Sequence, residues 1–187
     1  MKKLILLCAV CATSIALADD KKGEKKGEAA AKPPALHEMP DVKKVVDAFA
    51  GKWAMDAELT MPGAKPEKTK VTMECKKIAM GAGVSCAMEG KSSMGPMAQT
   101  CMIAHDPEGS GVHLMCVTSM GEVHDHKGKW KDDKTLEFEP YKGTMMGKPA
   151  TETVTMAMAD AKTMTMTSTT TTAEGDFVFS STAKKKK

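Results

Sequence analysis

The feature that most constrains the fold is an alternation of apolar and polar residues that begins after Gly51 and runs almost to the C-terminus. Gly, Pro, Asp and Ser divide the alternation into short runs. A period of two is typical of β-strands with one buried and one exposed face. The pattern predicts nine or ten strands, near residues 52–60, 68–78, 83–90, 97–105, 111–119, 122–131, 134–139, 144–158 (with a potential break at 147–149), 163–172 and 176–183.

The connections between these runs are too short to hold crossover helices. Successive strands joined by tight turns form an antiparallel meander, which buries its apolar face by closing on itself or by folding into a sandwich. We expect closure, that is, an all-β, up-and-down barrel over residues 41–184. One helix is predicted at its N-terminal end, at residues 41–50, because one face of that segment carries Val42, Val45, Val46 and Phe49.

The two ends of the chain have the character of unstructured or removable segments. Residues 1–18 read MKKLILLCAVCATSIALA, in which two lysines, an apolar run and a small-residue cleavage site predict a signal peptide. We therefore expect an exported protein, periplasmic or secreted. The apolar run is shorter than the roughly 20 residues of a membrane helix, so no membrane span is expected. Residues 19–40 are predicted to be a charged, disordered linker, and the lysines at 185–187 a solvated tail.

Composition argues against two broad classes of function. All 27 basic residues are lysine, and the chain has two Trp, one Tyr and four Phe. Nucleic-acid binders rely on arginine forks and stacking aromatics, so we expect no nucleic-acid partner. The sequence contains neither a Gly-x-Ser-x-Gly elbow nor a phosphate-binding glycine loop, and we expect no enzymatic activity.

Four cysteines lie in the predicted barrel. Residues that pair across a tight antiparallel turn have a constant sum of residue numbers. Turns centred on 80–81, 93–94 and 108–109 then place the cysteines side by side on four adjacent strands, on the apolar face. An even count in an oxidising compartment predicts disulfides. The simplest outcome is two cross-strand bonds, Cys75–Cys86 and Cys101–Cys116. The alternatives are one Cys86–Cys101 bond flanked by two thiols, and a four-cysteine metal site, which a flat row of ligands does not favour.

Two histidines stand on the same side of one predicted strand, at 124 and 126. A two-residue turn at Met120-Gly121 would pair Cys116 with Asp125 and direct both histidines outward. One bulge residue would reverse this and direct them inward. Trp130 has the same parity as the histidines, and its preference for the core favours the inward orientation.

Inward histidines would give a candidate metal site. The spacing of His124 and His126 can chelate a transition metal, and His105 lies on the same face as the cysteines. We therefore take His105, His124 and His126 as candidate ligands for Cu or Zn. The competing interpretation is a pair of solvated histidines and no cofactor.

The chain is also rich in methionine, with eighteen residues. A three-residue turn at 160–162 would place Met158 opposite Met164 and Met156 opposite Met166. Four thioethers at adjoining levels could hold Cu(I), whereas the favoured interpretation is a flexible core filler in a barrel short of aromatics.

Several short motifs are spread along most of the chain, and most of them are turn sequences. They are Phe49-Ala50-Gly51-Lys52-Trp53, Met80-Gly81-Ala82-Gly83, Glu89-Gly90, His105-Asp106-Pro107-Glu108-Gly109, Ser119-Met120-Gly121, the segment from Gly128 to Leu136, and the segment from Gly143 to Lys148. In order and spacing, over roughly residues 41–184, the chain resembles the secreted domain-of-unknown-function family 1579, whose members look lipocalin-like or calycin-like. The resemblance implies a barrel and an exported location, and it implies no activity.

These observations lead to three functional hypotheses. The first is binding of a small apolar or amphipathic ligand inside the barrel, since closed barrels of about eight strands or more can enclose one. The second is soft-metal binding through histidine and methionine. The third is a structural envelope protein whose barrel is filled by its own side chains.

Overall fold

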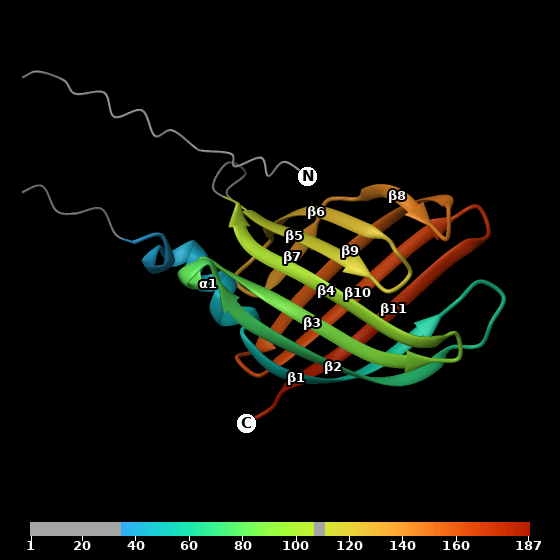
Figure 1. The fold of residues 1–187 in the computed structure, drawn as a ribbon, viewed down its shortest axis with the longest axis horizontal. Helices are drawn as coiled ribbons and strands as arrows, with labels where there is room; N and C mark the ends of the chain where they lie inside the picture. Colours follow the sequence, from blue (N-terminus) through green and yellow to red (C-terminus); the bar gives the residue numbers. More distant parts are fainter. Residues whose placement is uncertain (1–34, 107–110) are drawn as a thin grey trace, which may run out of the picture. The chain divides into compact units, whose positions relative to one another are not determined.

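The computed structural model describes residues 35–106 and 111–187 (Figure 1). The predicted signal peptide and residues 19–34 of the predicted linker lie outside the described residues. The elements in chain order are η1 (Leu36–Glu38), α1 (Pro40–Phe49), β1 (Gly51–Thr60), β2 (Glu67–Ile78), η2 (Ala79–Gly81), β3 (Gly83–Ser92), β4 (Gly95–Asp106), β5 (Gly111–Thr118), β6 (Val123–Trp130), β7 (Thr135–Phe138), β8 (Tyr141–Met145), β9 (Lys148–Asp160), β10 (Thr163–Thr172) and β11 (Gly175–Lys185).

Ten of these strands close into an antiparallel barrel (Figure 1). Neighbours follow chain order from β1 to β7, β11 pairs with β1, and β10 lies between β11 and β9. β9 completes the ring by pairing with β7, residues 155–157 against residues 135–137. The predicted all-β meander that closes into a barrel, with one N-terminal helix, is therefore confirmed.

β8 departs from the simple meander. It pairs with residues 148–152 of β9, so β7 and β8 follow one another along the same edge of β9. Pro140 lies between them, and since proline has no backbone N–H to donate, the ladder is interrupted there. The strand predicted at 144–158 is thus two strands, β8 and β9, which turn back on each other at Met146-Gly147, where φ is +51° and +77°.

The helix α1 lies at one end of the barrel (Figure 1) and packs its apolar face into it. All four side chains predicted for that face are buried, and the helix runs from Pro40 to Phe49, one residue ahead of the predicted span at each end. Trp53 at the start of β1 fixes the junction, because its buried Nε1–H donates to the Phe49 carbonyl at 2.8 Å. Within the described residues, no helix is long and apolar enough to cross a membrane.

The structure extends at both ends beyond the predicted limits of the domain. The 3-10 turn η1 lies in the segment assigned to the linker. At the C-terminus, Lys184 and Lys185 belong to β11, and Lys186 donates its backbone N–H to Lys52 at 2.7 Å. The ammonium of Lys185 lies 5.1 Å from the centroid of the Trp53 ring, a cation–π contact. In such a contact the methylene groups of a lysine cover apolar surface while its charge stays in water.

Candidate functional site

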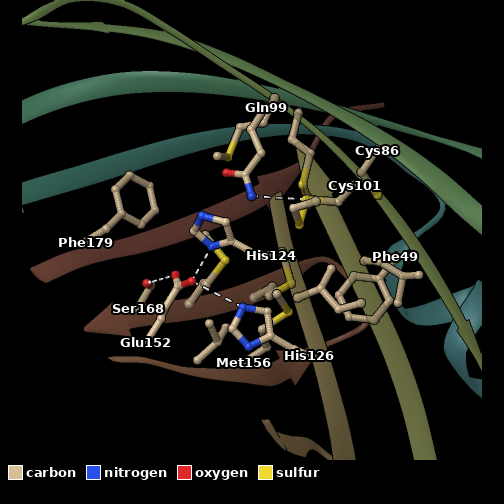
Figure 2. Close-up of a pocket in the computed structure, with 18 residues that line it drawn as sticks. Phe49, Cys86, Gln99, Cys101, His124, His126, Glu152, Met156, Ser168 and Phe179 are labelled. Carbon is tan, nitrogen blue, oxygen red and sulfur yellow. Dashed lines mark hydrogen bonds and ion pairs between the residues drawn. A yellow bond between two sulfur atoms is a disulfide. The ribbon is translucent and has the colours of Figure 1, made fainter. Parts of the chain in front are cut away.

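The barrel interior contains a cavity of about 140 Å³ with a mostly apolar wall (Figure 2). A second cavity of about 180 Å³ continues from it toward the turn between β3 and β4. The two share Met88, Gln99 and Phe179 in their walls. Together they reach the roughly 300 Å³ at which ligand pockets begin. We call this pair of cavities the lumen.

One part of the lumen wall is polar. His124 and His126 of β6 converge on Glu152 of β9 (Figure 2). Glu152 Oε2 is hydrogen-bonded to His124 Nδ1 and lies 3.2 Å from His126 Nε2. The other carboxylate oxygen accepts a hydrogen bond of 2.5 Å from the Ser168 hydroxyl. We call His124, His126, Glu152 and Ser168 the polar cluster.

The polar cluster is shielded from solvent, which sets its charge state. The His126 side chain is 2% exposed and that of Glu152 is 12% exposed. Burial raises the pKa of Glu152, but hydrogen bonds from His124, His126 and Ser168 outweigh it and hold that pKa well below its ordinary value. The hydrogen bond to Glu152 raises the pKa of His124, against the opposing effect of burial. The cluster therefore contains a carboxylate that stays ionised and an imidazole that readily takes a proton.

A single turn sets the inward orientation of the two histidines. Thr118 N–H donates to Glu122 O at 3.0 Å and Gly121 N–H donates to Thr118 O at 3.0 Å, which leaves three residues in the loop. Gly121 takes φ +79°, the left-handed conformation that supplies the extra residue. As a result Cys116 pairs with His124 and not with Asp125. Of the two predicted registers, the inward one is present.

The structure separates His105 from the other two predicted metal ligands. It lies near the end of β4, opposite Val112, which in turn pairs with Gly128 of β6. Glu152 joins His124 and His126 instead, and one ligand atom of each lies within 4.8 Å of the others. The alternation along the strand indicates that Glu152 points inward, because it lies on the same strand face as the buried Val154 and Met156. The same argument identifies Ser168, which shares its face with Met164 and Met166.

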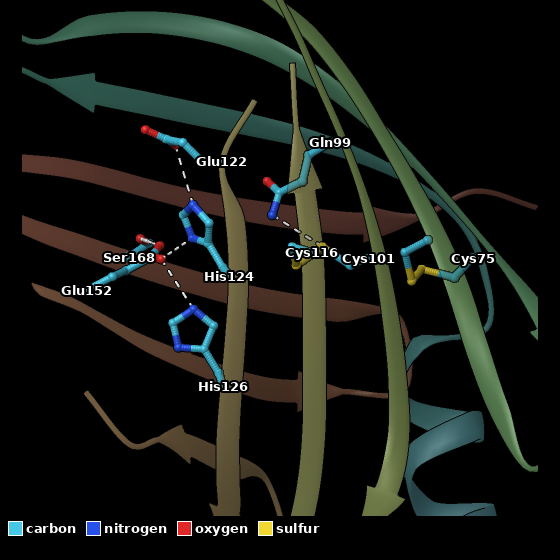
Figure 3. The surroundings of a disulfide bond; sticks show 10 residues. Cys75, Gln99, Cys101, Cys116, Glu122, His124, His126, Glu152 and Ser168 are labelled. Carbon is cyan, nitrogen blue, oxygen red and sulfur yellow. Dashed lines mark hydrogen bonds and ion pairs between the residues drawn. A yellow bond between two sulfur atoms is a disulfide. The ribbon is translucent and has the colours of Figure 1, made fainter. Parts of the chain in front are cut away.

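Two disulfides form the wall beside the polar cluster (Figure 3). The bonds are Cys75–Cys86 and Cys101–Cys116, which confirms the simplest predicted pairing. All three predicted registers hold, with Cys75 opposite Cys86, Cys86 opposite Cys101, and Cys101 opposite Cys116. Gln99 donates its amide N–H to Cys101 Sγ at 3.2 Å.

The methionines lie where the pattern places them. Met158 pairs with Met164 and Met156 pairs with Met166 across β9 and β10. Met156, Met164 and Met166 line the lumen, together with Met73 and Met88. The thioether side chains therefore form much of its apolar surface.

A lateral opening interrupts the barrel wall beside the polar cluster. β6 pairs with β7 only at 128–130, and β8 does not continue that ladder. The Tyr141 hydroxyl spans the gap by donating to Val123 O at 2.8 Å. A cavity of about 150 Å³ lies there, lined by both His124 and Glu152. These two side chains also line the lumen, so the polar cluster stands between the lumen and the lateral opening.

Several solved structures share this fold at low sequence identity. A protein from Mycobacterium tuberculosis, Rv2717c, is 11% identical, with a TM-score of 0.61 over 80% of this chain and 99% of its own. The S-type phycobiliprotein lyase CPES from Guillardia theta is 13% identical, with a TM-score of 0.55 over 81% of this chain and 96% of its own. Such likeness shows the fold alone.

Comparison of the sequence with curated proteins gives no match. The model of one protein family, described as "Protein of unknown function (DUF1579)", matches residues 39–185. This span takes in the whole barrel and the helix α1, and it agrees with the resemblance carried by the turn motifs. The chain therefore belongs to the DUF1579 family.

Proposed function

We propose that this chain is an exported, non-enzymatic binding protein that holds a small amphipathic molecule in its lumen. The observation that carries the proposal is a pair of adjoining, mostly apolar cavities, one of which has a polar wall. Methionine and phenylalanine side chains would remove a hydrocarbon body from water. The polar cluster would orient the polar end of the same molecule.

The division of the lumen favours an elongated ligand. The shared wall between its two cavities contains Met88 and Gln99, which are unbranched side chains with several rotatable bonds. Rotation of these two side chains would widen the connection between the cavities beside Phe179, which also lies in the shared wall. A ligand that occupies both would extend from the polar cluster to the turn between β3 and β4.

Two observations support the exported location. The Cys75–Cys86 and Cys101–Cys116 bonds are of a kind that persists in oxidising compartments and is rare in the cytosol. The leader-like pattern of residues 1–18 agrees with this.

The proposal can be tested by filling the lumen. Val154 is 5% exposed and lines the first cavity, whereas its neighbour Thr153 points outward. Val154→Phe should weaken binding of a fluorescent fatty-acid probe at least about tenfold, because the new ring occupies space that the probe needs. Thr153→Phe adds more bulk on the same strand and should leave the affinity unchanged. Equal binding by both variants, each with an unaltered melting curve, would place the probe outside the lumen and contradict the proposal.

A further inference from the structure

We infer that His124, His126 and Glu152 form a binding site for a divalent transition-metal ion of borderline softness, such as Zn²⁺. The inference goes beyond the proposed function, because it concerns an ion and not an organic ligand. It is carried by the convergence of three ligand atoms, by the groups that hold them, and by the access route beside them.

The three ligand atoms are already close to the spacing that one ion requires. Zinc lies about 2.0–2.2 Å from imidazole nitrogen and carboxylate oxygen, so ligand atoms around it are at most about 4 Å apart. Here they lie within 4.8 Å of one another, and His126 Nε2 is 3.2 Å from Glu152 Oε2. Two of the three come from one strand, two residues apart, and the third comes from β9, so all are placed by regular backbone. Side-chain shifts of about 1 Å would complete the site.

The chemistry of the ligand set selects the class of ion. Two imidazoles and one carboxylate suit Zn²⁺ and its neighbours in the first transition row. Thioethers, which Cu(I) prefers, are not among the three. A site of oxygen atoms alone, which Ca²⁺ and Mg²⁺ prefer, is not formed either. Three protein ligands leave a further coordination position, as in zinc sites that accept a water molecule or an external ligand.

Neighbouring side chains orient the ligands by hydrogen bonding and packing, as they do in known metal sites. Glu152 Oε1 accepts a hydrogen bond from the Ser168 hydroxyl, and this bond directs Oε2 toward the histidines. The second nitrogen of His124, Nε2, lies 3.4 Å from Glu122 Oε2. A carboxylate on the far nitrogen of a ligating histidine fixes its tautomer and orientation. The ring of His126 is held by packing instead, with its centroid 5.3 Å from that of Tyr141 and 6.0 Å from that of Phe138.

The burial of His126 argues against a purely structural role for the polar cluster. Its Nδ1 is buried and has no hydrogen-bond partner within the part of the chain that the structure describes. A buried imidazole with an unpaired nitrogen destabilises the fold, because the nitrogen loses its hydrogen bond to water without gaining another. An ion bound at Nε2 would leave Nδ1 without a partner, but its binding free energy would compensate for this destabilisation. The lateral opening between β6 and β8 gives the ion a route to His124 and Glu152.

The test is titration of the metal-free protein with Zn²⁺ alone. We expect one Zn²⁺ per chain by calorimetry and elemental analysis. Glu152→Gln keeps the shape and an oxygen for Ser168 but loses the charge, and it should weaken binding about 100-fold or more, as should His126→Ala. His113→Ala is the matched control, because His113 pairs with Asp125 on the outer face of the barrel. His105→Ala tests the ligand set predicted from sequence, and both controls should bind as the parent does.

A spectroscopic measurement on the parent protein guards against variants that fail to fold. Co²⁺ in place of Zn²⁺ should give the visible absorption of a low-coordinate nitrogen–oxygen site. Absence of stoichiometric Zn²⁺ binding by the parent would overturn the inference, and so would binding that survives Glu152→Gln or disappears with His113→Ala. These outcomes leave the lumen proposal untouched, because the fatty-acid probe is assayed without metal.

Discussion

The two disulfides support a quantitative prediction about stability. Each closes a short loop in the unfolded chain, of 11 residues for Cys75–Cys86 and 15 residues for Cys101–Cys116. In the chain-entropy model, closure of loops of these lengths stabilises the native state by about 2.8 and 3.0 kcal/mol at 25 °C. The loops follow one another in the sequence without overlapping, so the two contributions should add to about 6 kcal/mol. A domain of this size has a total stability of about 5–15 kcal/mol, so the fully reduced protein should be close to unfolding.

The assay is urea unfolding of the oxidised protein and of the same protein kept reduced, with no change of sequence. Cys75→Ala with Cys86→Ala, and separately Cys101→Ala with Cys116→Ala, then apportion the loss between the two bonds. Both pairs should lose about 3 kcal/mol, plus a smaller amount for the lost packing of the sulfur atoms. A loss below about 1 kcal/mol for either pair would refute the loop-entropy reasoning. A disulfide map with Cys86 joined to Cys101 would refute the register itself.

Three further predictions concern the polar cluster, the turn that orients it and the helix junction. The metal-free protein should be most stable between about pH 4.5 and 6.5. Folding lowers the pKa of Glu152, so the protein loses stability as the pH falls below 4.5, the ordinary pKa of this carboxyl group. Folding raises the pKa of His124, so the protein also loses stability as the pH rises above 6.5, the ordinary pKa of imidazole. Glu152→Gln should flatten both limbs in chelator-containing urea titrations, and an unchanged profile would show that the pair does not set them. Gly121→Val should cost about 1–2 kcal/mol in urea unfolding, since a β-branched residue resists the left-handed φ of +79°; a neutral effect would mean that the turn is not held in that conformation. Trp53→Phe should cost at least about 1–3 kcal/mol, because it leaves the buried Phe49 carbonyl without its donor at 2.8 Å. The half-buried Trp130, changed to Phe, is the control for that last measurement, and an equal loss from both would show that the hydrogen bond is not responsible.

The sequence predicts the pairing of β2, β3 and β4 correctly, because residues that pair across each of their turns have a constant sum of residue numbers. The turns at 80–81 and 93–94 are symmetric about their centres, so Cys75, Cys86 and Cys101 meet at one level. Burial of one face then allows only one register, since a slip of one residue would expose every apolar side chain. For these strands, pairing and side-chain direction follow from the sequence alone.

The sequence leaves the register of β6 open, because two turn conformations are compatible with the same residues. A two-residue loop would make Asp125 the partner of Cys116, whereas the three-residue loop between Thr118 and Glu122 makes it His124. No local preference settles that choice, whereas the burial of His126 and the packing of Trp130 against the core do. Tertiary contacts therefore fix what the turn residues alone do not.

The composition of the polar cluster is harder to predict from the sequence, since its members come from strands far apart in the chain. β7 pairs with β9 only at residues 135–137 and ends at Phe138, two residues before Pro140. Beyond the end of β7, beside the lateral opening, Glu152 contacts His124, although the two residues are 28 positions apart in the sequence. Strand parity places each of these side chains on the inner face, but it does not say which of them share a level along the barrel. His105 is inward by the same parity and lies elsewhere.

Native mass spectrometry of the untagged protein, isolated from the cells that produce it, tests most directly the claim that the lumen holds an amphipathic molecule. We expect a native mass that exceeds that of the polypeptide by one small organic molecule. This molecule should be lost on denaturation, absent from Val154→Phe and present in Thr153→Phe. A parent protein that carries no such molecule, and that also fails to take up a fatty-acid probe, would contradict the claim and indicate a barrel filled by its own side chains.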